Sequence, residues 1–92
     1  MYICNILYMS TCHITEATDN LMANGKIRDL VYYPKVEDGM QYGYFIYTED
    51  FMGNDVPEDL VRCVEFARNN GCSWINMDCD GDEVDGLPVY EL

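Results

Sequence analysis

Apolar positions along this chain change their spacing from one segment to the next, and each spacing indicates a type of secondary structure. Apolar residues that alternate or form short runs indicate strands, and apolar residues three and four apart indicate helices. From these periods we predict, in chain order, a strand at 3–9, a helix at 15–24, strands at 30–33 and 42–48, a helix at 57–70 and a strand at 73–77.

Capping residues define the ends of both predicted helices. Thr15 is expected to cap the first helix, and Asn54 or Asp55 the second. Gly25 and Gly71 follow the last apolar position of each helix, where glycine takes the left-handed conformation that ends a helix.

Turn residues separate the remaining segments. Pro34 is expected to stop the second strand, and the run Glu37-Asp38-Gly39 predicts a hairpin turn before the third. The tail at 86–90 is expected to add at most a short edge strand, because Pro88 is tolerated only at an edge or a strand start.

The resulting order of elements is βαββαβ, which is the ferredoxin-like pattern. We therefore predict an α+β fold, with two helices on one face of an antiparallel sheet. The length of 92 residues indicates a single domain spanning 1–92.

Acidic residues dominate the composition. Seventeen Asp and Glu oppose five Lys and Arg, which gives a formal net charge of −12. Direct nucleic-acid binding is disfavoured because phosphate contacts need Lys and Arg. A basic protein surface is the complementary partner.

The apolar content places the chain among folded, non-membrane proteins. Hydrophobic residues make up 49 % of the chain, yet no run approaches the length of about 18 apolar residues that a membrane span needs. The start, MYICNILYM, lacks the basic region and cleavage site of an export signal, so a cytoplasmic location is expected.

The five cysteines indicate reduced thiols rather than a disulfide framework. Their number is odd and their spacing is scattered, so we expect all five to be reduced and no metal or other cofactor to be bound. Cys4 and Cys63 lie among apolar neighbours and are expected in the core.

The aromatic residues of the third strand suggest a different surface. Tyr42, Tyr44 and Ile46 are expected on one face, and Gly43, Phe45 and Tyr47 on the other. Aromatic sheet surfaces can stack nucleic-acid bases, but the basic frame of such a surface is missing here. We therefore expect these tyrosines at the rim of the core.

The densest acidic feature follows the last predicted strand, between Asp78 and Asp85. Asp at alternate positions 78, 80 and 82 is typical of the start of a calcium loop. The match fails at position six of the loop, which should be Gly and is Glu83, and at position twelve, which should be Glu and is Val89. A solvated turn and a partner-facing acidic patch are the other interpretations.

A second group of candidate residues depends on the predicted topology. In an antiparallel sheet, the end of strand one, the end of strand three and the start of strand four would share one edge. That edge would bring together Cys12, His13, Glu49, Asp50 and Cys72. Zinc binding or Cys-His catalysis is the functional interpretation, and helix capping with ordinary packing is the structural one.

Several longer motifs resemble an uncharacterised family of small bacterial proteins. They are STCHIT at 10–15, YGYFIY at 42–47, PEDL at 57–60, NGCSW at 70–74 and VDGLPVY at 84–90. The resemblance brings no activity and no catalytic residues. It implies a location on phages, plasmids and genomic islands, where small acidic proteins are often anti-CRISPR or anti-restriction inhibitors.

Three hypotheses follow. The first is a non-enzymatic inhibitor of a nucleic-acid-handling host defence complex, which occupies a basic surface, as a DNA mimic would. The second is a regulatory or accessory domain with an unrelated protein partner, and the third is a metal-dependent enzyme that uses the edge at Cys12 and His13. For the first hypothesis, the predicted partner-binding residues are Asp78, Asp80, Asp82, Glu83 and Asp85, helped by Glu49, Asp50, Asp55, Glu58 and Asp59.

Overall fold

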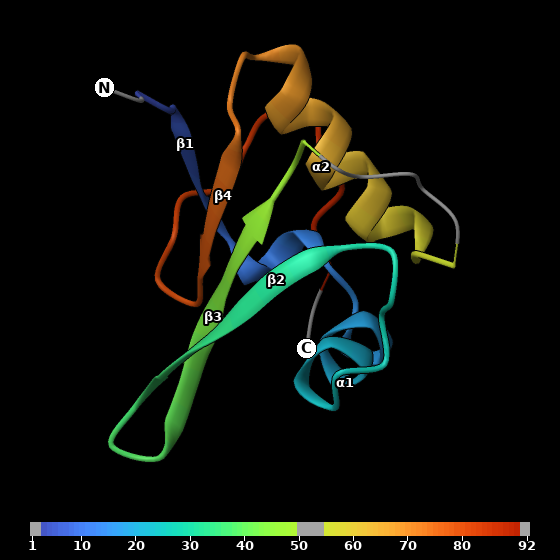
Figure 1. Ribbon diagram of the computed structural model, residues 1–92, viewed down its shortest axis with the longest axis vertical. Coiled ribbons are helices and arrows are strands. Elements are labelled where there is room, and N and C mark those ends of the chain that lie inside the picture. Colours follow the sequence, from blue (N-terminus) through green and yellow to red (C-terminus); the bar gives the residue numbers. More distant parts are fainter. Residues whose placement is uncertain (1–2, 50–54, 91–92) are drawn as a thin grey trace.

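The computed structural model describes residues 3–49 and 55–90. In chain order its elements are β1 (Ile6–Ser10), the 3-10 helix η1 (Thr11–His13), α1 (Glu16–Ala23), β2 (Val31–Glu37), β3 (Met40–Tyr47), α2 (Glu58–Asn69) and β4 (Trp74–Asp78) (Figure 1). The α+β class and the βαββαβ order are confirmed.

The sheet is mixed rather than wholly antiparallel, which corrects one part of the prediction. Its strand order is β1-β4-β3-β2. β4 runs antiparallel to β3 and parallel to β1, with Ile6 beside Trp74 and Ser10 beside Asp78. β4 is an inner strand and is partly or fully buried on both faces, with Ile75 buried and Trp74 half-buried. β1 is an edge strand and leaves Ile6 exposed.

One face of the sheet carries the core, and both helices pack on it, as predicted. Met9, Tyr44, Ile46, Ile75 and Met77 are fully buried on this face. The helices add their own buried side chains to the same cluster, which are Met22 from α1 and Leu60, Cys63, Val64 and Ala67 from α2. Cys63 is therefore a core residue as expected.

The ends of the helices agree with the capping residues in part. The Thr15 hydroxyl accepts the Thr18 N–H and caps α1. At the start of α2 the N-cap is Pro57, without a side-chain hydrogen bond, so Asp55 is not a cap; Asn54 lies outside the described residues. Glycines with positive φ follow both helices, as predicted, at Gly25 and Gly71.

β2 runs straight through Pro34 instead of stopping there. Pro34 pairs with Tyr44, and this is possible because β2 is an edge strand whose outer side needs no donor. The predicted hairpin turn is confirmed, since Asp38 and Gly39 both have the positive φ that a two-residue turn of this kind requires. The turn projects away from both helices (Figure 1).

The tail forms no strand in its described part, which ends at Tyr90, so the short edge strand predicted at 86–90 is not formed there. Cys4 is half-buried rather than part of the core. Within residues 3–49 and 55–90, the helices are too short and too polar to cross a bilayer.

Candidate protein-interaction site

The acidic segment, which we define as residues 78–85, turns back along the outer edge of β1 after leaving β4 (Figure 1). The Ser10 N–H donates to the carbonyl oxygen of Asp82 at 2.9 Å. Further along the chain, the Tyr90 N–H donates to the carbonyl oxygen of Cys12 at 2.8 Å. Backbone hydrogen bonds therefore hold the acidic segment at Asp82 and the chain beyond it at Tyr90. The segment is not a loose turn.

His13 is the central anchor of the same stretch. Its imidazole is only 1 % exposed, and the Val84 N–H donates to Nε2 at 2.9 Å. Nδ1 lies 2.8 Å from the carbonyl oxygen of Pro88, so the ring must carry its proton on Nδ1 and donate it there. One ring nitrogen thus binds the acidic segment and the other binds the tail. Neither nitrogen has a lone pair left for a metal ion or for a Cys12 thiol.

Gly81 brings the segment into direct backbone contact with β1. A Cβ at this position would lie 2.3 Å from the Met9 carbonyl oxygen and 2.8 Å from the Ser10 nitrogen. Only glycine permits so close an approach. The acidic segment is thus built to lie against the strand, with Asp80, Asp82, Glu83 and Asp85 exposed.

The predicted cluster of Cys12, His13, Glu49 and Cys72 does not form. Because β1 is parallel to β4, the end of β1 lies beside the end of β4 and the start of β3. Glu49 and Cys72 lie beyond the opposite end of β4, next to the pairing of Tyr47 with Trp74. Asp50 lies outside the described residues. The parallel pairing removes the geometric basis for the edge site.

Asp78 points to the sheet face opposite the helices and is half-buried there. Its Oδ2 accepts a hydrogen bond from the Lys35 ammonium, and its Oδ1 accepts the Asp80 N–H at 2.9 Å. The hydrogen bond from Lys35 is the main cause that holds the pKa of Asp78 below its ordinary value. Asp78 is therefore already paired within the molecule.

The same aspartate belongs to a compact acidic group. Within the described part of the chain, Asp78, Cys79 and Asp80 place ligand atoms within 4.8 Å of one another. Both oxygens of Asp78 have partners in the protein, which are the Lys35 ammonium and the Asp80 N–H. The calcium-loop pattern read from the sequence thus corresponds to a turn that Asp78 caps.

Asp59 does not belong to a partner-facing surface, which corrects its predicted role. It is 9 % exposed and reaches from α2 to the start of α1. Its carboxylate accepts the Thr15 N–H and the Thr18 hydroxyl, each at 2.8 Å. This residue fastens the two helices together.

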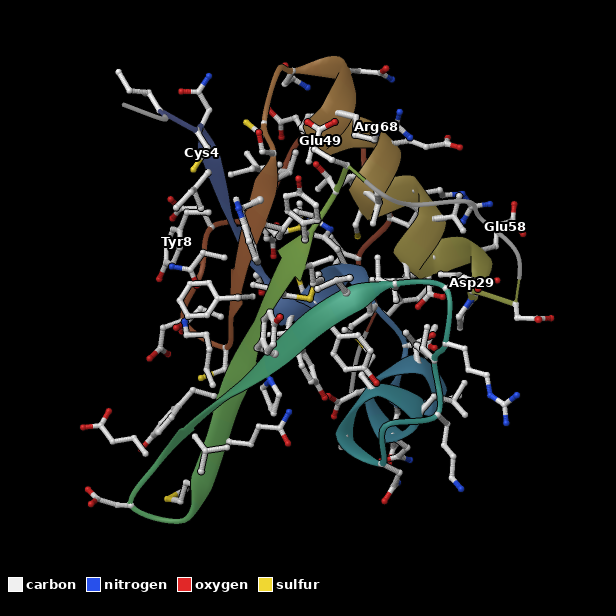
Figure 2. The ribbon with its side chains drawn as sticks, in the orientation of Figure 1. Cys4, Tyr8, Asp29, Glu49, Glu58 and Arg68 are labelled. Carbon is white, nitrogen blue, oxygen red and sulfur yellow. The ribbon has the colours of Figure 1, made fainter. Side chains whose placement is uncertain are left out.

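The other predicted contact residues are exposed but do not join the acidic segment. Glu49 lies at the upper end of the sheet and Glu58 on the far side of α2 (Figure 2). Asp55 precedes α2, and Glu58 pairs with Arg62 at 2.8 Å on the same helix. The predicted contact residues that the structure describes therefore form no single patch, and the four exposed acids of the segment are the ones that stay together.

A second surface borders this segment, and its tyrosines were expected at the rim of the core. Pairing across the sheet aligns Tyr8, Asn76, Phe45 and Tyr33 in one row on the face that the helices leave open. Tyr8, Phe45 and Tyr33 are 43 %, 38 % and 57 % exposed. In the next row, Trp74 packs against Tyr47 at 4.9 Å between ring centroids, and Tyr33 stacks on Trp74 at 6.5 Å. We call Tyr8, Tyr33, Phe45, Tyr47 and Trp74 the aromatic face.

The acidic segment and the aromatic face form one continuous surface. Partial desolvation raises the pKa of Tyr8, and the neighbouring carboxylates of Asp78, Asp82 and Asp80 add to this effect. Tyr8 lies on the side of β1 away from α2 (Figure 2). The lining of an open hollow includes Lys35, Phe45, Asp78 and Asp80. The two surfaces therefore lie next to each other at Tyr8.

In its described residues the chain is a small α+β domain with a mixed four-stranded sheet whose helices lie on one face. Comparison with family models places the chain more narrowly. Residues 6–92 match the C-terminal domain of a family of unknown function, DUF5983, and the chain belongs to that family. The expectation of an uncharacterised family is confirmed to this extent. Comparison with curated proteins found no match, and comparison with solved structures found none.

Proposed function

We propose that this protein is a non-enzymatic binding domain that presents its acidic segment to a basic surface of a partner protein. The observation that carries the proposal is the anchoring of the segment by His13, Gly81 and Ser10. A solvated turn needs no such anchors, whereas recognition is favoured when charges are held on a rigid scaffold before binding. Electrostatic attraction to a net charge of −12 would speed the encounter with a basic partner.

The finer form of the proposal is an inhibitor of a nucleic-acid-handling defence complex in a bacterial cytoplasm, of the anti-CRISPR or anti-restriction type. It is supported by the resemblance to proteins of phages, plasmids and genomic islands, and by the acidity of the chain. In such an inhibitor the segment would occupy part of a DNA-binding surface. The other described contact candidates lie away from the segment, so the proposed mimicry uses this end of the molecule.

The test compares two sets of four neutralised acids. One variant replaces the exposed acids of the segment, namely Asp80→Asn, Asp82→Asn, Glu83→Gln and Asp85→Asn. The matched control replaces four exposed acids elsewhere, namely Glu16→Gln, Glu49→Gln, Asp55→Asn and Glu65→Gln. Both variants carry the same net charge and differ only in where charge is lost.

Phage plating on strains with active restriction and CRISPR systems measures the outcome. The parent and the control should protect incoming phage, and the segment variant should lose most of that protection. Equal protection by both variants would show that the position of the segment is irrelevant. No protection by the parent in any strain would overturn the finer form of the proposal.

A further inference from the structure

The open face of the sheet already holds a cationic group, which is the ammonium of the protein's own Lys35. The Lys35 ammonium lies 5.4 Å from the centre of the Phe45 ring and donates to the Asn76 side-chain oxygen at 2.8 Å. It also pairs with the Asp78 carboxylate. A ring, a carboxylate and an amide oxygen converge on one point, which is the chemistry that receives a basic side chain.

The backbone explains how Lys35 reaches that point. Lys35, Gly43 and Asp78 lie in one row across β2, β3 and β4. Gly43 has no side chain, so the lysine stem crosses β3 without obstruction. The contact is therefore a product of the sheet register rather than of a chance surface rotamer.

The rest of the face offers further exposed rings and a further carboxylate. Tyr33 and Tyr8 are half-exposed rings, and Asp80 lies beside the hollow that Lys35 borders. Among the described residues of this face, Lys35 is the one basic side chain, and it is matched by Asp78. The exposed rings and the unpaired acids of the segment leave room for cations supplied from outside.

We propose that the aromatic face and the acidic segment together receive arginine side chains of a basic segment in a partner protein. The inference rests on the proposed function and names the partner's chemistry. Arginine fits better than lysine because its planar guanidinium stacks on rings, is weakly hydrated and pairs with carboxylates through two bonds. An incoming guanidinium would lie on Tyr33, Phe45 or Tyr8 and compete with Lys35 for Asp78.

The experiment uses nona-arginine and nona-lysine peptides as probes, because they carry equal charge and differ only in the cationic group. The chain has one tryptophan, and Trp74 lies within the aromatic face, so its fluorescence reports directly on occupancy. Titrations at low and high salt give the affinities. Nona-arginine should bind about fivefold more tightly than nona-lysine, given the size of exposed cation–π contacts.

A double variant isolates the rings. Tyr33→Leu with Phe45→Leu keeps the apolar area but removes both π faces, and both positions are exposed enough to tolerate the change. In this variant, which keeps Tyr8, the preference for arginine should shrink, and an unchanged preference would contradict the role of the two rings. Leu21→Ala, an exposed apolar position on α1, is the control and should keep the preference. Thermal unfolding verifies that each variant is folded.

The outcomes separate this inference from the function on which it rests. Equal binding of both peptides that disappears in the segment variant would overturn the arginine inference and leave acidic recognition standing. Failure of both peptides to bind at low salt would overturn both proposals. Preferential binding of single-stranded oligo(dT), or concentration-dependent self-association in sedimentation, would also overturn the inference by giving the face another occupant.

Discussion

At the residue scale, His13 shows how one buried side chain can position a charged surface. Its two ring nitrogens hold Val84 and Pro88, which lie at and beyond the end of the acidic segment. His13 is buried and acts through the backbone that it holds, so it is a positioning residue and not a contact residue for a partner protein. A sequence search for catalytic Cys-His pairs selects the same residue for a different reason.

Replacing His13 by Ala should loosen the tail without unfolding the domain. Two hydrogen bonds are lost and the Val84 N–H is left without its acceptor, which costs about 1–3 kcal/mol locally. Hydrogen exchange should therefore become about 10- to 100-fold faster at Val84 and Tyr90, while amides of α2 keep their protection. Unchanged exchange at Val84 would mean that the backbone bonds to Ser10 and Cys12 hold the tail alone.

The cysteine thiols differ in their burial, as the acidic side chains do. Cys63 is 1 % exposed, and burial, with a contribution from the Asp59 charge, raises its pKa to about 12; Cys79 is exposed. In the native protein at pH 8, Cys79 should react with a thiol reagent and Cys63 should not, because the thiolate is the reactive form. Cys79→Ser should remove the fast phase. Rapid labelling of Cys63 would show that the core opens far more often than its packing indicates.

The same shift has a consequence for stability. In the unfolded chain Cys63 ionises near its ordinary pKa of 9.0, whereas in the folded protein it stays protonated to about 12. The unfolded state therefore binds fewer protons in this range, and this group makes stability fall as pH rises above 9. Below pH 9 it has no effect.

At the scale of elements, the pairing of β3 with β4 depends on Gly43. Its φ is +153°, and a Cβ would lie 1.9 Å from the Met77 carbonyl oxygen of β4. Gly43→Ala must therefore push the two central strands apart. We expect a loss of at least about 3 kcal/mol in unfolding free energy, from backbone strain and overpacking together.

Gly71→Ala is the matched control for that experiment. It also has positive φ, at +74°, but a Cβ there meets nothing within 4 Å. It should cost only about 1–2 kcal/mol, the price of a left-handed alanine. Denaturant unfolding of both variants measures the difference, and equal losses would contradict the close approach of the strands.

The elements themselves were predictable because their signals are local. Thr15, Gly25 and Gly71 marked helix ends, and Asp38-Gly39 marked the hairpin, each within a few residues. The parallel pairing of β1 with β4 was not predictable, because both strands are short apolar runs and no local residue distinguishes their order in the sheet. The predicted cluster at Cys12 and His13 was wrong for the same reason, because it depended on antiparallel pairing of these strands.

The candidate site was predictable in part for the same reason. The acidic segment is a local feature, and its acids at 80, 82, 83 and 85 are exposed as expected, whereas Asp78 is half-buried and paired with Lys35. Asp59 was misassigned because its partners, Thr15 and Thr18, lie on another helix and were hidden from a local pattern. The aromatic face depends on cross-strand register, which brings Tyr8, Phe45 and Tyr33 into one row.

At the scale of the whole molecule, self-repulsion works against the compact state. The net charge of −12 is held in a body of 34 × 28 × 27 Å. Salt screens such repulsion. The midpoint of thermal unfolding should therefore rise as sodium chloride is added at pH 7, and the segment variant, with four fewer charges, should start higher and rise less. A midpoint that falls with salt would mean that pairs such as Lys35–Asp78 outweigh the repulsion.

The parallel pair at the edge of the sheet also determines the order of events during synthesis. The β2–β3 hairpin joins neighbouring residues and can close as soon as it emerges from the ribosome, whereas Ile6 pairs with Trp74 near the other end of the described chain. Until β4 is made, Ile6 and Leu7 have no strand beside them. β1 is translated before the other strands of this sheet and is thus among the last of them to be protected, so its edge stays exposed to aggregation and to chaperones throughout that interval.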